Sequence, residues 1–146
     1  MGDYYTHENQ IKDLILKFSD HTLPAEEWTH QAHLTIAFWH LFHFSIEEAT
    51  CYLKSGIISY NHSNGTENTP SGGYHESITL FWIKVIYDYQ SKYSLKSLLE
   101  CCNAFLESEF ADKNYIFSFY SKDILFTSRA RAFWVEPNIQ VLNIAV

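Results

Sequence analysis

The chain has 146 residues, enough for a single domain over 1–146 that buries its own hydrophobic core without disulfides or a structural metal. Its 17 acidic residues outnumber its 10 basic residues, which gives a net charge of −7. Nucleic acids and anionic membranes are bound by clustered lysine and arginine, so the composition argues against both partners. The sequence contains no bilayer-length apolar run and no signal-peptide pattern at its start, and we therefore expect a cytoplasmic protein.

Helical spacing of apolar residues begins near the start of the chain. Residues 8–19 carry one apolar face and predict a first helix. Pro24 suits the first position of a second helix, which we expect to continue through Phe42. This second helix is apolar on nearly every side, a pattern typical of a central, buried helix.

A third helix is predicted to open at Ser45–Glu48, which has the form of a capping box, and to run toward Tyr60. The polar stretch 61–73 follows, and it has no hydrophobic periodicity. Loops of this length inside a domain often serve as lids. Because this loop leads directly into His75, we expect it to cover the functional site.

Helical patterns continue through the second half of the chain. We expect a fourth helix over about 74–89, a fifth over 94–106 and one or two short helices within 112–134. Residues 139–146 form a tail of undefined structure. No segment shows convincing strand alternation, so the sequence predicts an all-α fold, a compact single-domain helical bundle of five to seven helices.

Two histidines near the start of the second helix are candidate metal ligands. His30 and His33 are three residues apart, which places them on the same side of a helix. Ala37 lies between them one turn further on, where a small side chain leaves open space. Core packing would favour leucine or alanine at the two histidine positions, and buried imidazoles need polar partners.

His75 supplies a third imidazole, with Glu76 beside it in the sequence. Thr79 shares the helical face of His75 and can hydrogen-bond its ring from outside a metal site. Three imidazoles and a carboxylate are the ligand set of a catalytic zinc or iron centre, so we expect all three histidines to bind a divalent metal. Glu76 or Glu27 would be the fourth ligand or the general base.

Several functions are compatible with this candidate site. With zinc, a bound water would be a nucleophile for hydrolysis, and with iron, two histidines and a carboxylate would activate oxygen. A non-catalytic module is the alternative, in which the histidines hydrogen-bond or stack on a small organic ligand together with Tyr60, Asn61, Tyr74 and Trp82. A third possibility is an interaction protein that forms homo-oligomers. Arg129 has two interpretations, a clamp for a ligand carboxylate or phosphate and a surface ion pair.

Four segments carry motifs that are specific as a set: Trp28–Leu34, Tyr60–Asn61, Gly73–Thr79 and Trp134–Pro137. They resemble the motifs W-T-H-x-A-H-L, R-Y-N, G-Y-H-E-T-x-T and W-V-E-P of a family of short, uncharacterised bacterial proteins, over most of the chain from Trp28 to Pro137. Ser59 stands where that family has arginine, and Ser77 where it has threonine. The family brings no established activity, so the resemblance supports the choice of residues and leaves the mechanism open.

Overall fold

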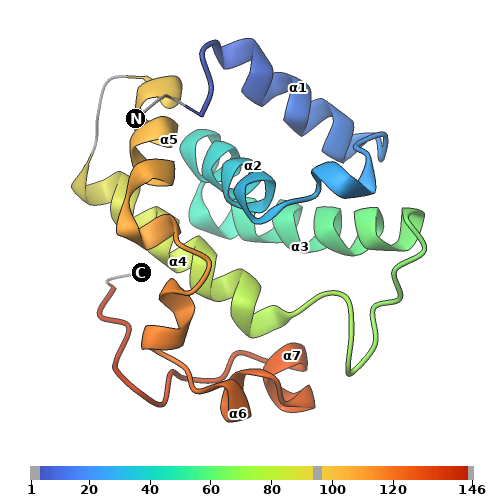
Figure 1. Cartoon of the computed structure of the whole chain (residues 1–146), viewed down its shortest axis with the longest axis vertical. Helices are drawn as coiled ribbons and strands as arrows, with labels where there is room; N and C mark the ends of the chain where they lie inside the picture. Colours follow the sequence, from blue (N-terminus) through green and yellow to red (C-terminus); the bar gives the residue numbers. More distant parts are fainter. Residues whose placement is uncertain (1–3, 94–96, 145–146) are drawn as a thin grey trace.

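A central helix, α2, is surrounded by the other long helices in the computed structural model, which describes residues 4–93 and 97–144 (Figure 1). The fold is all-α, as predicted, with no strand among these residues. The α-helices are α1 (Glu8–Ser19), α2 (His30–His43), α3 (Ile46–Ser63), α4 (Glu76–Lys92), α5 (Leu98–Glu107), α6 (Lys122–Leu125) and α7 (Ser128–Ala132). Three 3₁₀ turns lie at Ala25–Glu27, Glu109–Ala111 and Tyr115–Ser118.

The position of α2 follows from its composition. It packs against α1, α3, α4 and α5, so most of its apolar residues are covered, although Phe42 near its end is exposed. Phe38 is fully buried and its ring lies 5.7 Å from that of Phe105 on α5. The prediction of a central, buried helix is confirmed.

The start of this helix differs from the prediction. Pro24 precedes only a 3₁₀ turn, and α2 begins six residues later, at His30. Thr29 causes the break, because its backbone is extended and its side-chain oxygen accepts a hydrogen bond from the Ala32 amide at 3.1 Å. The cap places both His30 and His33 in the first turn of α2.

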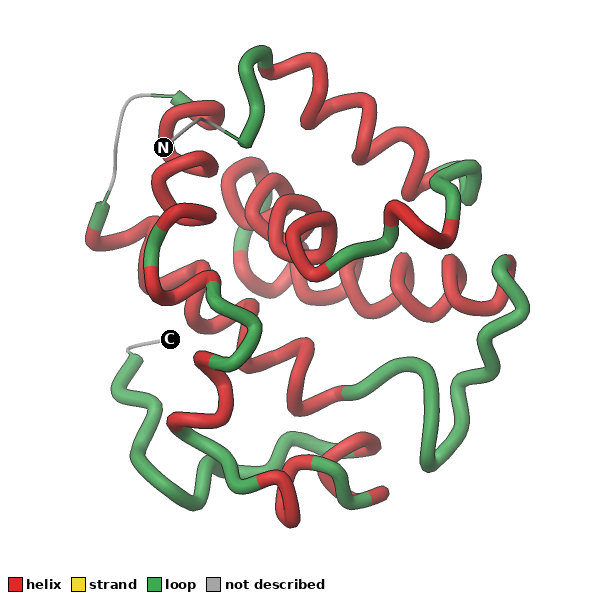
Figure 2. Tube along the Cα trace, in the orientation of Figure 1, coloured by secondary structure: helices red, strands yellow, loops and turns green. Residues whose placement is uncertain are grey.

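The connection between α3 and α4 is the longest loop of the structure (Figure 2). It starts later than predicted, since α3 continues to Ser63. Asn68 organises the loop by accepting hydrogen bonds from the Asn61 side chain at 3.1 Å and the Tyr74 amide at 2.9 Å. Gly73 has a φ of +77°, and a Cβ there would lie 2.4 Å from the Glu67 carbonyl oxygen, so the turn into α4 requires glycine.

The C-terminal segments pack against α4. Ser77, at the start of α4, donates to the Phe133 carbonyl oxygen at 2.8 Å and accepts from the Val135 amide at 3.1 Å. Tyr120 donates to the Val135 carbonyl oxygen at 2.5 Å. These contacts fix the chain beyond α7 below α4 (Figure 1).

The fifth helix lies one residue later at each end than 97–106, the part of the predicted range that the structure describes. It begins at Leu98, where Ser97 accepts a hydrogen bond from the Glu100 amide as the N-cap, and it ends at Glu107. The expected start, 94–96, lies outside the described residues. Within residues 4–93 and 97–144, no helix combines the length and the apolar character needed to cross a membrane.

Candidate functional site

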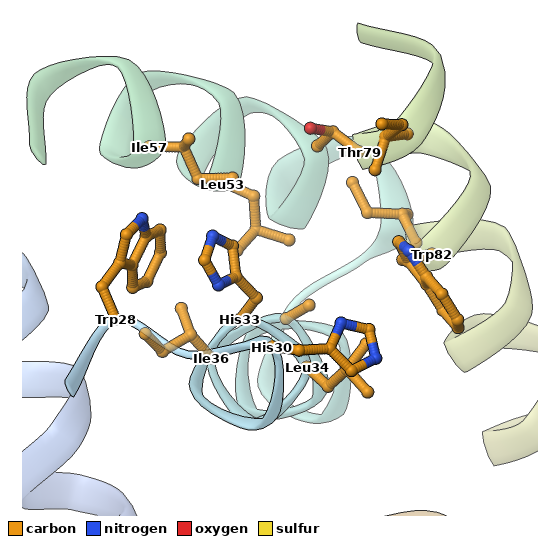
Figure 3. A pocket seen from close by; sticks show the side chains of 12 residues that line it. Trp28, His30, His33, Leu34, Ile36, Leu53, Ile57, Thr79 and Trp82 are labelled. Carbon is orange, nitrogen blue, oxygen red and sulfur yellow. The ribbon is translucent and has the colours of Figure 1, made fainter. Parts of the chain in front are cut away.

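A pocket of about 330 Å³ lies where α2, α3 and α4 meet, and it contains the two histidines of α2 (Figure 3). Its volume is near the lower end of the range for ligand-binding pockets, roughly 300–1,000 Å³. Aliphatic and aromatic side chains make most of its wall. The lining residues are Trp28, His30, His33, Leu34, Ile36, Ala37, Leu53, Ile57, Ile78, Thr79, Trp82 and Ile83.

His33 stands up from α2 into this pocket, toward Leu53 and Ile57 of α3 (Figure 3). Its Nδ1 donates a hydrogen bond to the Thr29 carbonyl oxygen at 2.6 Å. The indole of Trp28 covers one side of the ring, with 3.6 Å between the ring centroids. Burial lowers the pKa of His33 to about 4, against the opposing effect of the Thr29 carbonyl, so the ring is neutral at pH 7.

His30 lies beside His33 and turns toward α4 (Figure 3). Its Nε2 donates to the Ala111 carbonyl oxygen at 2.9 Å, and its ring meets that of Trp82 edge to face at 5.2 Å. Burial also lowers the pKa of His30, although the Ala111 carbonyl favours the protonated form. Both imidazoles of the pocket are therefore held in place by backbone carbonyls, that of Thr29 at the N-cap of α2 and that of Ala111 in the 3₁₀ turn Glu109–Ala111.

Ala37 lines the pocket one turn after the two histidines, as the helical spacing predicted. Two aromatic walls face each other across the space, since Trp28 precedes α2 and Trp82 lies on α4 (Figure 3). Aspartate, glutamate, lysine and arginine are absent from the residues that line this pocket. The site is thus apolar, with neutral imidazoles as its main polar groups.

His75 does not join His30 and His33. It is the N-cap of α4, and its buried ring uses both nitrogens within the protein: Nε2 donates to the Leu125 carbonyl oxygen at 2.7 Å, and Nδ1 accepts from the Ile78 amide at 3.2 Å. Burial lowers its pKa, as expected for a neutral ring in this position. Among residues 4–93 and 97–144, no three His, Cys, Asp or Glu side chains are grouped so that they could hold a metal ion.

Glu76 belongs to a polar network beside the pocket. Its carboxylate accepts from Lys54 Nζ at 2.7 Å and from the Tyr74 hydroxyl at 2.7 Å. Burial and the Glu76 carboxylate raise the pKa of Tyr74, and a hydrogen bond with Thr79 acts in the opposite direction. Thr79 is the one member of this network that also lines the pocket.

Three other predicted contact residues lie outside the pocket. Tyr60 is buried behind Trp28, 4.8 Å between ring centroids, and donates to the Leu23 carbonyl oxygen at 2.7 Å. Asn61 supports the long loop through Asn68, and Glu27 is exposed on the 3₁₀ turn before α2. Tyr60 thus supports the aromatic wall, whereas the other two are not among the residues that line the pocket.

Arg129 and Tyr74 line a second, more open groove between the long loop and α7. The Arg129 guanidinium lies 6.0 Å from the centre of the Phe133 ring. The neighbouring Arg131 donates to the Gly73 carbonyl oxygen at 2.9 Å and fastens the loop to α7. The expectation that the loop covers the histidines is therefore corrected, because its residues line this groove and not the histidine pocket.

Sequence reasoning missed the wall of the pocket that α3 contributes. Leu53 and Ile57 are four residues apart, so they share one face of the helix, and that spacing is visible in the sequence. The same spacing is typical of ordinary core packing, so it does not distinguish a pocket wall from a core face. Trp28 could have been predicted as part of the site, because it is the first residue of the motif that contains His30 and His33.

Comparison of the chain with models of protein families, with curated proteins and with solved structures finds no match. The resemblance of its motifs to a bacterial family stays a prediction.

Proposed function

We propose that this protein binds a small, neutral organic compound in the pocket between α2, α3 and α4. The observation that carries the proposal is the placement of His33, a neutral imidazole held at the edge of an apolar space of about 330 Å³. Ligand pockets combine apolar walls with a few convergent polar groups in this way. The proposed role is that of a binding module, one of the alternatives compatible with the sequence.

The fixed position of the polar groups supports this proposal. His33 is held by Thr29 on one side and by Trp28 on another, and His30 is held by Ala111. A ligand that enters does not have to order these rings, so little binding energy is lost to their immobilisation.

The contacts of the other predicted metal ligands favour an organic ligand over a metal ion. Both ring nitrogens of His75 bond to backbone groups, and Glu76 is paired with Lys54 and Tyr74. A metal ion bound to His75 would have to displace one of its two hydrogen bonds, and a metal ion bound to Glu76 would compete with Lys54 and Tyr74 for the carboxylate. Elemental analysis of protein purified without a histidine tag tests this directly: we expect less than stoichiometric zinc or iron, and one ion per chain would contradict the proposal.

Binding of indole, followed in the amide NMR spectrum of the labelled protein, tests the pocket itself. An apolar cavity of suitable size binds small aromatic compounds. We expect saturable shifts confined to amides of α2, α3 and α4 around the pocket. Ala37→Leu fills the space beside His33 and should abolish these shifts, whereas Ser55→Leu, on the exposed side of α3, should leave them unchanged. Equal binding by both variants would place the ligand elsewhere.

A further inference from the structure

We infer that the ligand of this pocket carries a hydrogen-bond donor, an N–H or O–H group, and that this group donates a hydrogen bond to Nε2 of His33. The ligand class is therefore neutral and mostly apolar, with at least one such donor. This inference rests on the proposed function and adds the chemical feature by which the pocket selects among apolar compounds.

His33 is the tautomer that carries its proton on Nδ1. A backbone carbonyl oxygen can only accept a hydrogen bond, so the 2.6 Å contact with Thr29 requires the proton on Nδ1. In a neutral imidazole the other nitrogen is then an acceptor. Nε2 of His33 thus carries a lone pair at the end of the ring that points away from the α2 backbone (Figure 3).

His30 is the opposite tautomer, with its proton on Nε2. Nε2 of His30 donates to the Ala111 carbonyl oxygen, which leaves Nδ1 as the acceptor. Two acceptor nitrogens therefore belong to adjacent rings of one pocket. The indole N–H groups of Trp28 and Trp82, on the two facing walls of the pocket, are donors, so they would pair with an acceptor on the ligand.

Ligands that lack a donor are disfavoured in this pocket. In an apolar pocket, a compound that covers Nε2 of His33 without donating to it leaves a desolvated acceptor with no hydrogen bond. A ligand acceptor at that position would add repulsion between two lone pairs. Charged donors are disfavoured as well, because the lining residues include no carboxylate to balance an ammonium group. A neutral N–H or O–H group on the ligand gives Nε2 of His33 its hydrogen bond without placing an unbalanced charge in the pocket.

Indole and benzofuran test this inference, since they share one bicyclic shape and differ by an N–H group in place of an oxygen. We expect indole to bind roughly 3- to 10-fold more tightly, the range expected for one neutral hydrogen bond. In His33→Phe the acceptor is lost while a ring remains against Trp28, so the two compounds should bind equally. His30→Phe is the matched control on the adjacent ring, and it should keep the preference for indole.

A measurement on the unaltered protein keeps the test independent of the variants. Two-bond ¹H–¹⁵N spectra of protein labelled at histidine report which ring nitrogen carries the proton. We expect His33 protonated on Nδ1, with an Nε2 signal that shifts when indole is added and stays in place with benzofuran. A proton on Nε2, or equal binding of the two compounds by the wild type, would overturn the inference and leave ligand binding intact. Binding of neither compound would overturn the proposed function.

Discussion

The indole of Trp28 and the imidazole of His33 lie ring against ring, 3.6 Å between centroids, at the entrance to α2. Trp28 is in turn stacked on Phe18 of α1, with 5.2 Å between centroids. Trp28 thus packs between the ring of His33 and α1, while Nε2 of His33 faces the pocket. The break in the helix at Thr29 makes this possible, because it turns Trp28 back over the first turn of α2.

Stability toward acid should depend on His33. Its pKa falls from 6.5 in the unfolded chain to about 4 in the folded protein, chiefly through burial. The unfolded state therefore binds more protons between these two pH values, and the free energy of unfolding decreases as the pH falls through this window. The contribution of this residue is up to about 3 kcal/mol and is fully lost only below pH 4, while above 6.5 it is constant. Urea unfolding at a series of pH values measures it.

His33→Gln isolates this effect. Burial also lowers the pKa of His30 and of His40, and those contributions remain in the variant. The difference between wild type and variant should therefore vary with pH only between about 4 and 6.5. A difference that is constant over this range would show that folding does not lower the pKa of His33.

His75→Ala should destabilise the protein by about 2–4 kcal/mol, because it removes the N-cap of α4 and leaves the Leu125 carbonyl oxygen without its donor. Chemical denaturation measures the change. His62→Ala is the matched control, since His62 is exposed near the end of α3, and we expect a change within about 0.5 kcal/mol. Unchanged stability of His75→Ala together with the loss of a stoichiometric metal would instead establish His75 as a metal ligand.

The ion pair between Lys54 and Glu76 should contribute modestly to stability. A double-mutant cycle of Lys54→Met and Glu76→Gln is expected to give a coupling energy below about 1 kcal/mol, because 37% of the lysine side chain is exposed. Glu76→Gln keeps an acceptor for the Tyr74 hydroxyl, so the variant should fold. If Glu76 were a general base, this substitution would leave stability near wild type and reduce turnover by roughly two to four orders of magnitude.

Two glycines of the long loop provide a matched pair. Gly65 and Gly73 both have positive φ, +78° and +77°, but a Cβ at Gly65 has no atom within 4 Å, whereas one at Gly73 would lie 2.4 Å from a backbone oxygen. Gly65→Ala should cost about 1 kcal/mol from backbone strain alone, and Gly73→Ala should cost more.

Amide hydrogen exchange gives a second measurement on this pair. The Tyr74 amide donates to Asn68, and its exchange should accelerate in Gly73→Ala, because the loop must shift to admit the methyl group. Gly65→Ala should leave that exchange rate unchanged. Equal destabilisation and equal exchange in both variants would show that the close approach at Gly73 relaxes freely.

Local patterns in the sequence accounted for the all-α fold, for the burial of α2 and for the position of His30 and His33 on one side of it beside Ala37. Helical periodicity reports which residues of one segment share a face, so these features were predictable. The start of α2 was predicted wrongly because both Pro24 and Thr29 are residues at which a helix can begin. In the structure the helix begins after Thr29, and Trp28, just before it, packs on Phe18.

Only the tertiary structure determined the backbone partners of His75 and His30, whereas His33 bonds to Thr29 four residues earlier in the chain. Leu125 lies 50 residues from His75, and Ala111 lies 81 residues from His30. Their carbonyl oxygens are ordinary backbone groups with no signature in the sequence, so whether an imidazole bonds to one of them or stays open toward a ligand depends on how distant segments pack. The sequence therefore determined which side chains had unusual chemistry for a helix start, and the packing of α3 and α4 onto α2 determined which nitrogens face the pocket.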